Sequence, residues 1–281
     1  MTPKSPSLTA YDFLGYIVPG LMLVALIDAS IYYHIEDGNV SYTLLHDRYF
    51  NIKIAGIIPI LLFSYLVGHI LGFISAVLIE RHATWLHGTP TQFLLSNTKP
   101  LDYFKTAGAS PKTSFFLRLC TALIILPITI IDFIFTKHIP ISANYIKALD
   151  PLLISASAEV HASILKKLDI KKIGKDDWSS ADIHRLTIHC SLESAPAHVS
   201  SLRNYVVLYG FLRSVTLIAV VIFWVALFHL NGMVVWWKVI VASLVSGFFA
   251  FICYAAYLKF WIRYHREGIM AMIASYVNSK Q

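Results

Sequence analysis

The hydrophobic residues of this chain fall into long apolar runs separated by polar segments. Four runs are interpreted as membrane-spanning helices, since about 20 apolar residues cross a ~30 Å hydrocarbon core: Phe13–Tyr33, Ile54–Ile79, Ser214–Leu230 and Val234–Tyr257. The short turn Asn231–Met233 joins the last two into an antiparallel hairpin. The pattern predicts an all-α, polytopic membrane protein.

A fifth apolar run, Leu119–Phe135, is of marginal length and contains Pro127 and Asp132. Lys and Arg are retained on the cytoplasmic side of spans. Four spans place the basic segment Arg81–Arg118 and the basic C-terminal tail on that side, together with both termini, whereas five spans would place the tail outside. We therefore favour four spans plus a re-entrant, interfacial or domain-buried helix at 119–135, with a fifth span as the alternative.

This topology divides the chain into three parts. Residues 1–79 form an N-terminal membrane hairpin, and residues 205–281 form a C-terminal membrane hairpin with a basic cytoplasmic tail. Residues 80–204 form a cytoplasmic domain between spans two and three, which we expect to be mainly helical because Pro and Gly breaks separate its segments.

Small residues recur along the second span. Ser64, Gly68, Gly72 and Ala76 are four residues apart, which places them on one helix face. Lipid gives helices no hydrophobic reason to associate, so such a face is typical of close helix packing. We expect this span to be the packing centre of the membrane part.

The composition supports a membrane location. With 57% hydrophobic and 14% charged residues, the chain is too apolar for an ordinary soluble domain. The three cysteines (Cys120, Cys190 and Cys253) are far apart and provide no disulfide framework, which favours a membrane facing a reducing cytoplasm.

Four polar groups lie in or beside the apolar runs: Asp28, His69, Asp132 and Arg213. A charge at the centre of a spanning helix costs at least ~2.5–3.5 kcal/mol, so these groups are expected to line a hydrated path or to form buried pairs. Simpler interpretations remain open: Arg213 snorkels to the interface, and His69 makes a neutral interhelical hydrogen bond.

The densest basic cluster lies in the central domain and comprises Lys166, Lys167, Lys171, Lys172 and Lys175. On a helix these residues would form one broad face, which could bind a phosphate-bearing ligand, an oligonucleotide or anionic headgroups. The alternative is a solvated, membrane-proximal helix that is basic only because of the topology rule.

Catalytic and metal signatures are weak. His161, His184, His189, His198 and Cys190 could suggest a metal site, but the spacing from His184 to His189 does not align two ligands on one helix face. The chain lacks G-x-S-x-G, H-E-x-x-H, Walker and dinucleotide-binding motifs. We predict no enzyme activity, no metal and no cofactor.

Three segments carry a family resemblance: YDFLGYIVPG at Tyr11–Gly20, the APAH and RNYVVLYGFLR sequences between Ala195 and Arg213, and YLKF at Tyr257–Phe260. The chain resembles uncharacterised bacterial inner-membrane proteins and, through them, membrane effectors of anti-phage abortive-infection systems, such as the Hailong channel effectors. The resemblance implies a location in the bacterial inner membrane. It also implies a homo-oligomeric, ion-conducting assembly controlled by a nucleotide or oligonucleotide from a partner nucleotidyltransferase.

Together these features favour an oligomeric membrane effector, acting as an ion channel or depolarising pore, whose cytoplasmic domain receives an anionic signal. Its expected partners are further copies of the chain, membrane lipid and the nucleotidyltransferase or its product. The alternative is a non-conducting membrane scaffold or partner-binding subunit, and an enzyme acting on lipid is a third interpretation.

Overall fold

The computed structural model describes residues 12–35, 54–96, 103, 111–138, 149–167, 185–186, 188–189, 196–228 and 236–280. Within these residues the fold is all-α and contains no strand. Four helical stretches are long and apolar enough to cross a membrane: Phe13–Ile31, Gly56–His87, His198–Phe228 and Trp236–Asn278. The predicted all-α, polytopic fold is confirmed.

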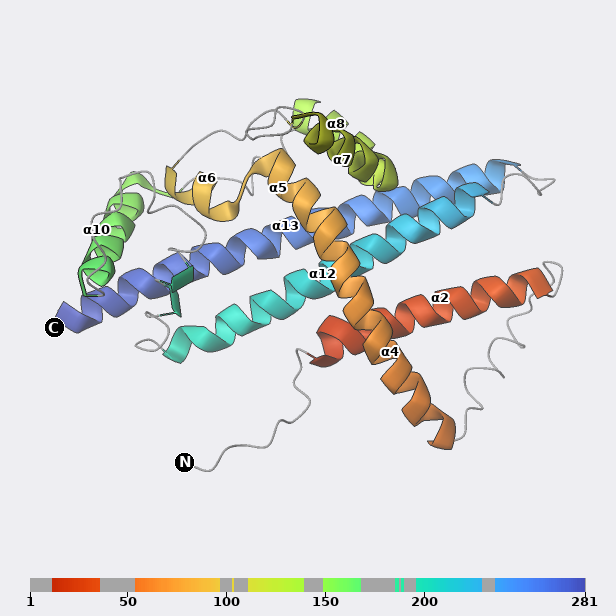
Figure 1. Ribbon diagram of the computed structural model, residues 1–281, viewed down its shortest axis with the longest axis horizontal. Coiled ribbons are helices and arrows are strands. Elements are labelled where there is room, and N and C mark those ends of the chain that lie inside the picture. The colour runs from red at the N-terminus through yellow and green to blue at the C-terminus, as the bar shows by residue number, and fades with distance from the viewer. Residues whose placement is uncertain are drawn as a thin grey trace.

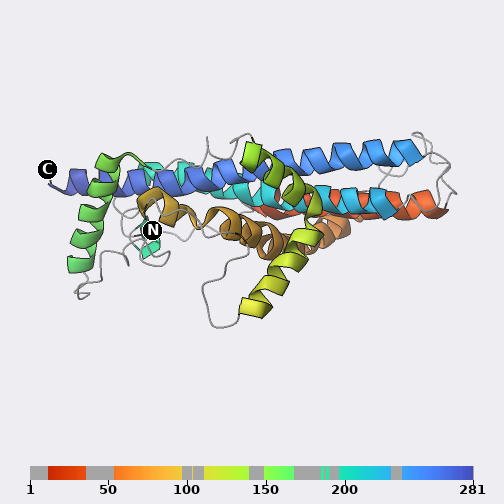
Figure 2. The same cartoon turned by 90° about the horizontal axis from the view of Figure 1, so that it is seen from above.

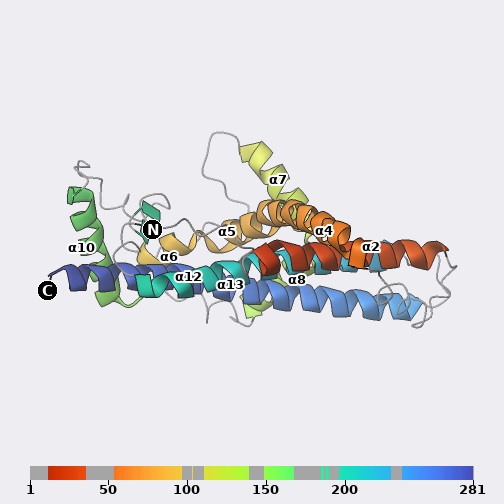
Figure 3. The same ribbon diagram turned by 90° about the horizontal axis from the view of Figure 1, so that it is seen from below.

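The C-terminal hairpin is the longest part of the molecule. Helices α12 (Pro196–Phe228) and α13 (Trp236–Lys280) lie side by side over much of their length (Figures 1 and 3). With 45 residues, α13 is about 67 Å long at 1.5 Å per residue, more than twice a hydrocarbon core. Both helices therefore extend well beyond the apolar runs that the sequence marks as spans.

The two helical segments of the N-terminal hairpin pack with their backbones in direct contact. A π-helical turn, η1 (Phe13–Ile17), continues into α2 (Val18–Ile35), and α4 (Ile54–Ser75) crosses α2 and α12 steeply (Figure 1). At the crossing, a Cβ atom added to Gly68 would lie 2.0 Å from the carbonyl oxygen of Tyr16. Only glycine allows so close an approach.

The chain leaves α4 through a second π-helical turn, η2 (Ala76–Glu80), and continues into α5 (Arg81–His87). Helix α5 ends at Gly88, whose φ of 81° lies in the left-handed region, and α6 (Pro90–Ser96) follows. These short helices lead from α4 toward the C-terminal part of α13 (Figure 1).

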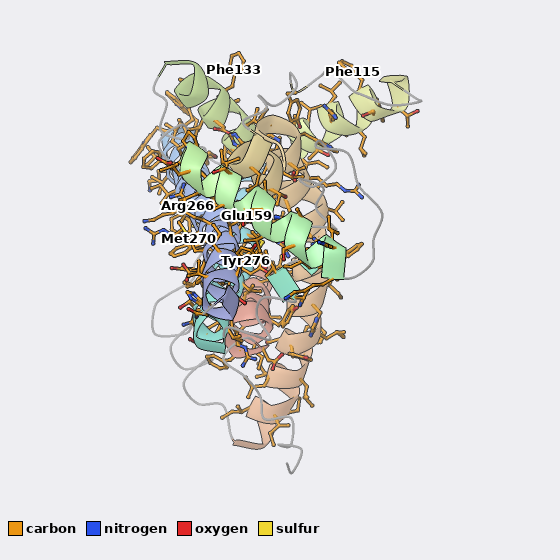
Figure 4. All side chains as sticks on the ribbon, turned by 90° about the vertical axis from the view of Figure 1, so that its left-hand side faces the viewer. Phe115, Phe133, Glu159, Arg266, Met270 and Tyr276 are labelled. Carbon is orange, nitrogen blue, oxygen red and sulfur yellow. The ribbon has the colours of Figure 1, made fainter. Side chains whose placement is uncertain are left out.

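A helical unit between the second and third candidate spans packs on that part of α13. Helix α10 (Pro151–Lys167) lies across α13 near its C-terminus, and α6 packs beside it (Figures 1 and 4). Their shared core consists of Leu94, Leu95, Leu149, Val160, Ile262, Ile269 and Met272. The Tyr276 hydroxyl donates to Glu159 Oε1 at 3.1 Å and adds a polar contact at the surface.

Two further helices form a sharp elbow. Helices α7 (Pro111–Ile124) and α8 (Leu126–His138) meet at Ile125 with a bend of 96°. Helix α8 packs on α13, whereas α7 points away from the long helices (Figure 2). The predicted run 119–135 is therefore two helices, because Pro127 cannot donate the backbone hydrogen bond that would continue α7.

His161 makes the stability of the helical unit sensitive to pH. Its side chain is 1% exposed, its Nδ1 donates to the Ser157 carbonyl at 2.7 Å, and burial lowers its pKa below the ordinary 6.5. The unfolded chain then binds the proton more readily, so stability is full above pH 6.5 and falls as the pH drops below it.

We expect His161→Leu to lose part of the drop in thermal midpoint that native protein shows between pH 7.5 and pH 5.5. The control is His189→Gln, at an exposed position, which should leave that drop unchanged. An unaltered pH dependence in His161→Leu would assign the effect to other groups.

Candidate functional site

The exposed apolar surface of the long helices ends at a defined level along their length. Large apolar side chains are exposed on α4 as far as Ile74 and on α13 as far as Ile252, and α13 exposes none between Ile252 and Val277. Buried and partly buried polar side chains are concentrated where this surface ends. We call them the polar layer, which comprises Ser75, Glu80, His82, His87, Asp132, Arg213, Tyr254 and Tyr257.

One half of the polar layer is an ion pair between α12 and η2. The Arg213 guanidinium donates to Glu80 Oε2, to Ser75 Oγ at 3.2 Å and to the Gly72 carbonyl at 3.3 Å. The guanidinium thus binds groups on α4 and η2 and does not snorkel as a lone side chain. It ties the N-terminal hairpin to the C-terminal hairpin.

Buried aromatic side chains of α13 border this ion pair and shield it from solvent on one side. Tyr257 is fully buried close to Glu80 and Arg213, and its ring stacks on Trp261 with centroids 5.7 Å apart. Its hydroxyl, like that of Tyr254, makes no hydrogen bond among the described residues. Buried hydroxyls without partners are rare in proteins, so a water molecule or a bound group would stabilise this point.

The other half of the polar layer begins at His82, which is 1% exposed. The Tyr103 hydroxyl donates to the Arg118 carbonyl at 3.2 Å, so it must accept its 3.1 Å hydrogen bond from His82 Nδ1–H. Burial raises the pKa of Tyr103 to about 12, although the nearby Arg118 opposes the shift. Tyr103 therefore stays protonated at neutral pH and keeps this hydrogen-bond direction.

Both arms of the α7–α8 elbow are attached to α5. The Arg118 guanidinium of α7 lies over the Trp85 ring, 5.2 Å from its centroid. On α8, Asp132 Oδ2 is 3.6 Å from His87 Nε2, and both side chains are at most 7% exposed. One short helix, α5, therefore contacts both α7 and α8 and holds the two arms of the elbow together.

The tip of the elbow rests against the C-terminal hairpin. Trp224 Nε1 donates to the Ile124 carbonyl at 2.7 Å, and Thr129 Oγ1 donates to the Ala122 carbonyl at 3.1 Å. Beside them, a Cβ atom added to Gly247 would lie 3.2 Å from Pro127 Cβ. Carbonyls freed by the helix break are thus satisfied by side chains, as an apolar environment requires.

We expect Trp224→Phe to lower the stability of the chain by about 0.5–1.5 kcal/mol, because it removes the hydrogen bond to the exposed Ile124 carbonyl. The measurement is a thermal or denaturant unfolding curve in detergent. The matched control is Trp236→Phe, whose side chain is 66% exposed. Equal stability of the two variants would show that the indole N–H does not hold the elbow.

The remaining polar residues predicted in the membrane lie elsewhere. His69 is exposed on α4, with its ring stacked on Tyr16 at 3.8 Å and edge-on to Tyr65 at 4.5 Å. Asp28 is half-buried on α2. The structure therefore brings Asp132 and Arg213 into the polar layer and leaves Asp28 and His69 outside it.

The basic cluster and the candidate metal ligands are only partly described. Lys166 and Lys167 are exposed in the last turn of α10, whereas Lys171, Lys172 and Lys175 lie outside the described residues, as do His184 and Cys190. His198 Nδ1 is 3.0 Å from Glu267 Oε1 and links α12 to α13. In the part of the chain that the structure describes, no three His, Cys, Asp or Glu residues could hold a metal together.

Sequence reasoning missed most members of the polar layer. Glu80 follows the second span directly, and His82 and His87 lie in the segment assigned to the central domain. A usable signal was present, since Glu80 and Arg213 are opposite charges at the same predicted membrane boundary. The tyrosines gave no such signal, because Tyr254 and Tyr257 are ordinary residues for the end of a spanning helix.

Comparisons with protein-family models, with curated protein sequences and with solved structures found no match for this chain.

Proposed function

We propose that this chain is the subunit of a homo-oligomeric membrane effector that conducts ions in response to an anionic signal. The membrane is the bacterial inner membrane, with the helical unit and both termini on the cytoplasmic side. The signal is a nucleotide or oligonucleotide made by a partner nucleotidyltransferase, and the role is anti-phage defence.

The observation that carries the proposal is the unbroken course of α13. Its N-terminal half exposes large apolar side chains from Trp236 to Ile252, and its C-terminal part packs against α10 through Ile262, Ile269 and Met272. One helix therefore belongs both to the membrane part and to the helical unit. A change at α10 is transmitted to the membrane part through a rigid element, which is what a gated effector requires.

The basic end of α10 supports an anionic ligand. Lys166 and Lys167 are exposed in the last turn of this helix, where their ammonium groups can contact phosphate oxygens. Val160, in the same helix, contacts the core shared with α13. A phosphate group bound at this end would thus act on the helix that packs directly on α13.

The polar layer supports a conducting or gating role. Arg213 and Glu80 lie next to the buried Tyr257 hydroxyl, and Asp132 lies near the buried Tyr254 hydroxyl. Neither hydroxyl has a hydrogen-bond partner among the described residues. Polar groups at the edge of an apolar bundle are typical of hydrated paths and gates. The same groups also fit a non-conducting scaffold, which the experiments below distinguish from a channel.

The first experiment measures conduction. Expression of the chain together with the signal should depolarise bacterial cells loaded with a potential-sensitive dye, and purified protein should pass current across a planar bilayer. Purified protein that forms stable oligomers in detergent but passes no current with the cell-derived signal would support the scaffold instead.

A second experiment tests whether the basic cluster binds the anionic signal. We expect replacement of Lys166, Lys167, Lys171, Lys172 and Lys175 by Gln to abolish depolarisation while insertion and oligomer size stay unchanged. Binding of ATP and of short oligoribonucleotides to the native chain should weaken steeply as salt rises, because each phosphate contact releases counter-ions. The control variant replaces Lys238 and Lys259, which lie on α13 and outside the basic cluster. A quintuple variant that still depolarises cells in response to the signal would refute the binding role of the basic cluster.

A further inference from the structure

The α7–α8 elbow exposes large apolar side chains along both of its arms. Members of this set are between 46% and 68% exposed, and they include Phe116, Leu117 and Leu123 on α7 and Ile130, Phe133 and Ile134 on α8. Figure 4 shows Phe115 and Phe133 on the side of the elbow away from α13. So large an apolar surface marks a place where the protein contacts something other than water.

The base of the elbow lies at the polar layer. Arg118 of α7 and Asp132 of α8 both contact α5, and Asp132 is itself a member of the polar layer. The charged side chains of the elbow that the structure describes are therefore close to α5, and the residues between them, from Leu119 to Ile131, carry no charge.

The tip of the elbow lies at a different level. Trp224 donates to the last carbonyl of α7, and Pro127 lies against Gly247. At 1.5 Å per residue, Trp224 is about 16 Å along α12 from Arg213, and Gly247 is about 10 Å along α13 from Tyr254. Both displacements lead from the polar layer into the part of the hairpin that the sequence marks as spans (Figure 2). The elbow thus dips from the polar layer into the apolar level of the long helices.

The backbone at the tip is built for an environment without water. Ile125, the residue between the two helices, is fully buried, its N–H donates to the Thr121 carbonyl at 3.0 Å, and its carbonyl accepts from the Ile128 N–H at 3.0 Å. Side chains satisfy the neighbouring Ala122 and Ile124 carbonyls. Non-helical backbone at membrane depth is tolerated only where protein buries it in this way.

These observations separate the interpretations that the sequence left open for this segment. A helix buried in the central domain would not expose its large apolar side chains. An interfacial helix would keep its tip at the level of the polar layer, and a fifth span would not bring both arms back to α5. Only a re-entrant segment has its base at the polar layer and its tip among the spans.

We infer that the α7–α8 elbow enters the bilayer from the side of α5, turns at Ile125 within the hydrocarbon and contacts lipid acyl chains with its exposed side chains. Lipid is the occupant because Leu244 and Phe248 of α13, at the level of the tip, are 68% and 53% exposed on a candidate span. The inference requires that the four long helices cross a membrane, and it does not depend on conduction or on the signal.

The first test is fluorescence quenching of the full chain in phosphatidylcholine vesicles. Single cysteines carry a bimane label in a background with Cys120→Ser, Cys190→Ser and Cys253→Ala. Leu123→Cys reports on the tip, and Leu244→Cys is the reference for a lipid-facing position. The matched control is Leu152→Cys, a 78% exposed leucine on α10 in the helical unit.

We expect phosphatidylcholine with brominated acyl chains to quench the labels at positions 123 and 244 alike. Iodide in the buffer should quench the label at position 123 roughly tenfold less than the label at position 152, because an anion does not enter hydrocarbon. If Leu123→Cys fails to insert, Ile124→Cys, at a position that is 46% exposed, reports on the same level.

The second test addresses the two ends of the elbow. Thr113→Cys, near the start of α7, and Lys137→Cys, near the end of α8, are treated with a membrane-impermeant maleimide in right-side-out and inverted vesicles. Both positions should react from the same side of the membrane.

Each contrary result overturns the inference. Iodide quenching at position 123 equal to that at position 152 would place the tip in water. Weak quenching by both agents would show that protein, such as a second copy of the chain, covers the elbow in place of lipid. Reaction of positions 113 and 137 from opposite sides would make the elbow a fifth span. None of these results alters the current that the chain passes, so the proposed function is tested separately.

Discussion

Gly68→Ala is expected to lower the stability of the chain by about 3 kcal/mol or more, the upper range for overpacking a tight contact. The added Cβ would lie 2.0 Å from the Tyr16 carbonyl oxygen and 2.9 Å from Tyr16 Cα. Both are backbone atoms, so no side-chain rotation can relieve the clash. The hairpin of α2 and α4 must separate at the point where the two helices cross.

The same crossing predicts a graded series of glycine variants. A Cβ atom on Gly20 would lie 1.8 Å from the Ser64 carbonyl oxygen, so Gly20→Ala should be as severe as Gly68→Ala. On Gly72 the nearest atom would be a ring carbon of Tyr16 at 3.5 Å, an ordinary contact, so Gly72→Ala should be tolerated. Gly15→Ala is the control in η1, where nothing lies within 4 Å.

The measurement is thermal unfolding and oligomer size of each variant in detergent. If Gly68→Ala and Gly15→Ala unfold at the same temperature, the two backbones do not meet at Gly68 in the folded chain.

Arg213→Met should be nearly as damaging as the two severe glycine changes. It leaves the Glu80 carboxylate with neither its ion pair nor a hydrogen-bond donor from α12. Breaking a buried pair typically costs 3–5 kcal/mol. The Glu80 side chain is 36% exposed, so solvent screening reduces the expected loss to about 2–3 kcal/mol.

A double-mutant cycle tests this pair. Arg213→Met combined with Glu80→Gln should recover part of the loss, because the remaining carboxamide carries no charge. The control is Arg203→Met, at an exposed position of the same helix. Strictly additive effects of the Arg213 and Glu80 changes would show that the two side chains are not coupled.

The apolar runs were sufficient to predict the fold class, since apolar stretches of this length have few alternatives to spanning helices. The glycine spacing on α4 likewise indicated the side that packs, although the severe contact is at Gly68 and Gly20 and the contact at Gly72 is loose. The sequence could not show that Gly20 is the partner, because that depends on where two helices cross.

The polar layer could not be predicted from the sequence for a different reason. Asp132 and His87 are far apart in sequence, and they meet only because the elbow at Ile125 turns α8 back toward α5. Hydrophobic periodicity indicates which residues are apolar but carries no information on bend angles. Pro127 marked the break, and the 96° between the two arms required the structure.

The π-helical turn η2 has a consequence for the register of everything after it. The Arg81 N–H bonds to the Ala76 carbonyl, five residues back, so this turn holds one residue more than an α-helical turn. Without the extra residue, α5 would be rotated by about 100° relative to α4. His82 and His87 would then point away from Tyr103 and Asp132, while Gly68 stayed against Tyr16. The single inserted residue thus sets the rotation about the helix axis that separates Gly68 from His82 and His87. A one-residue deletion in α4 before η2 would turn the glycine face and the histidine face out of alignment with their partners.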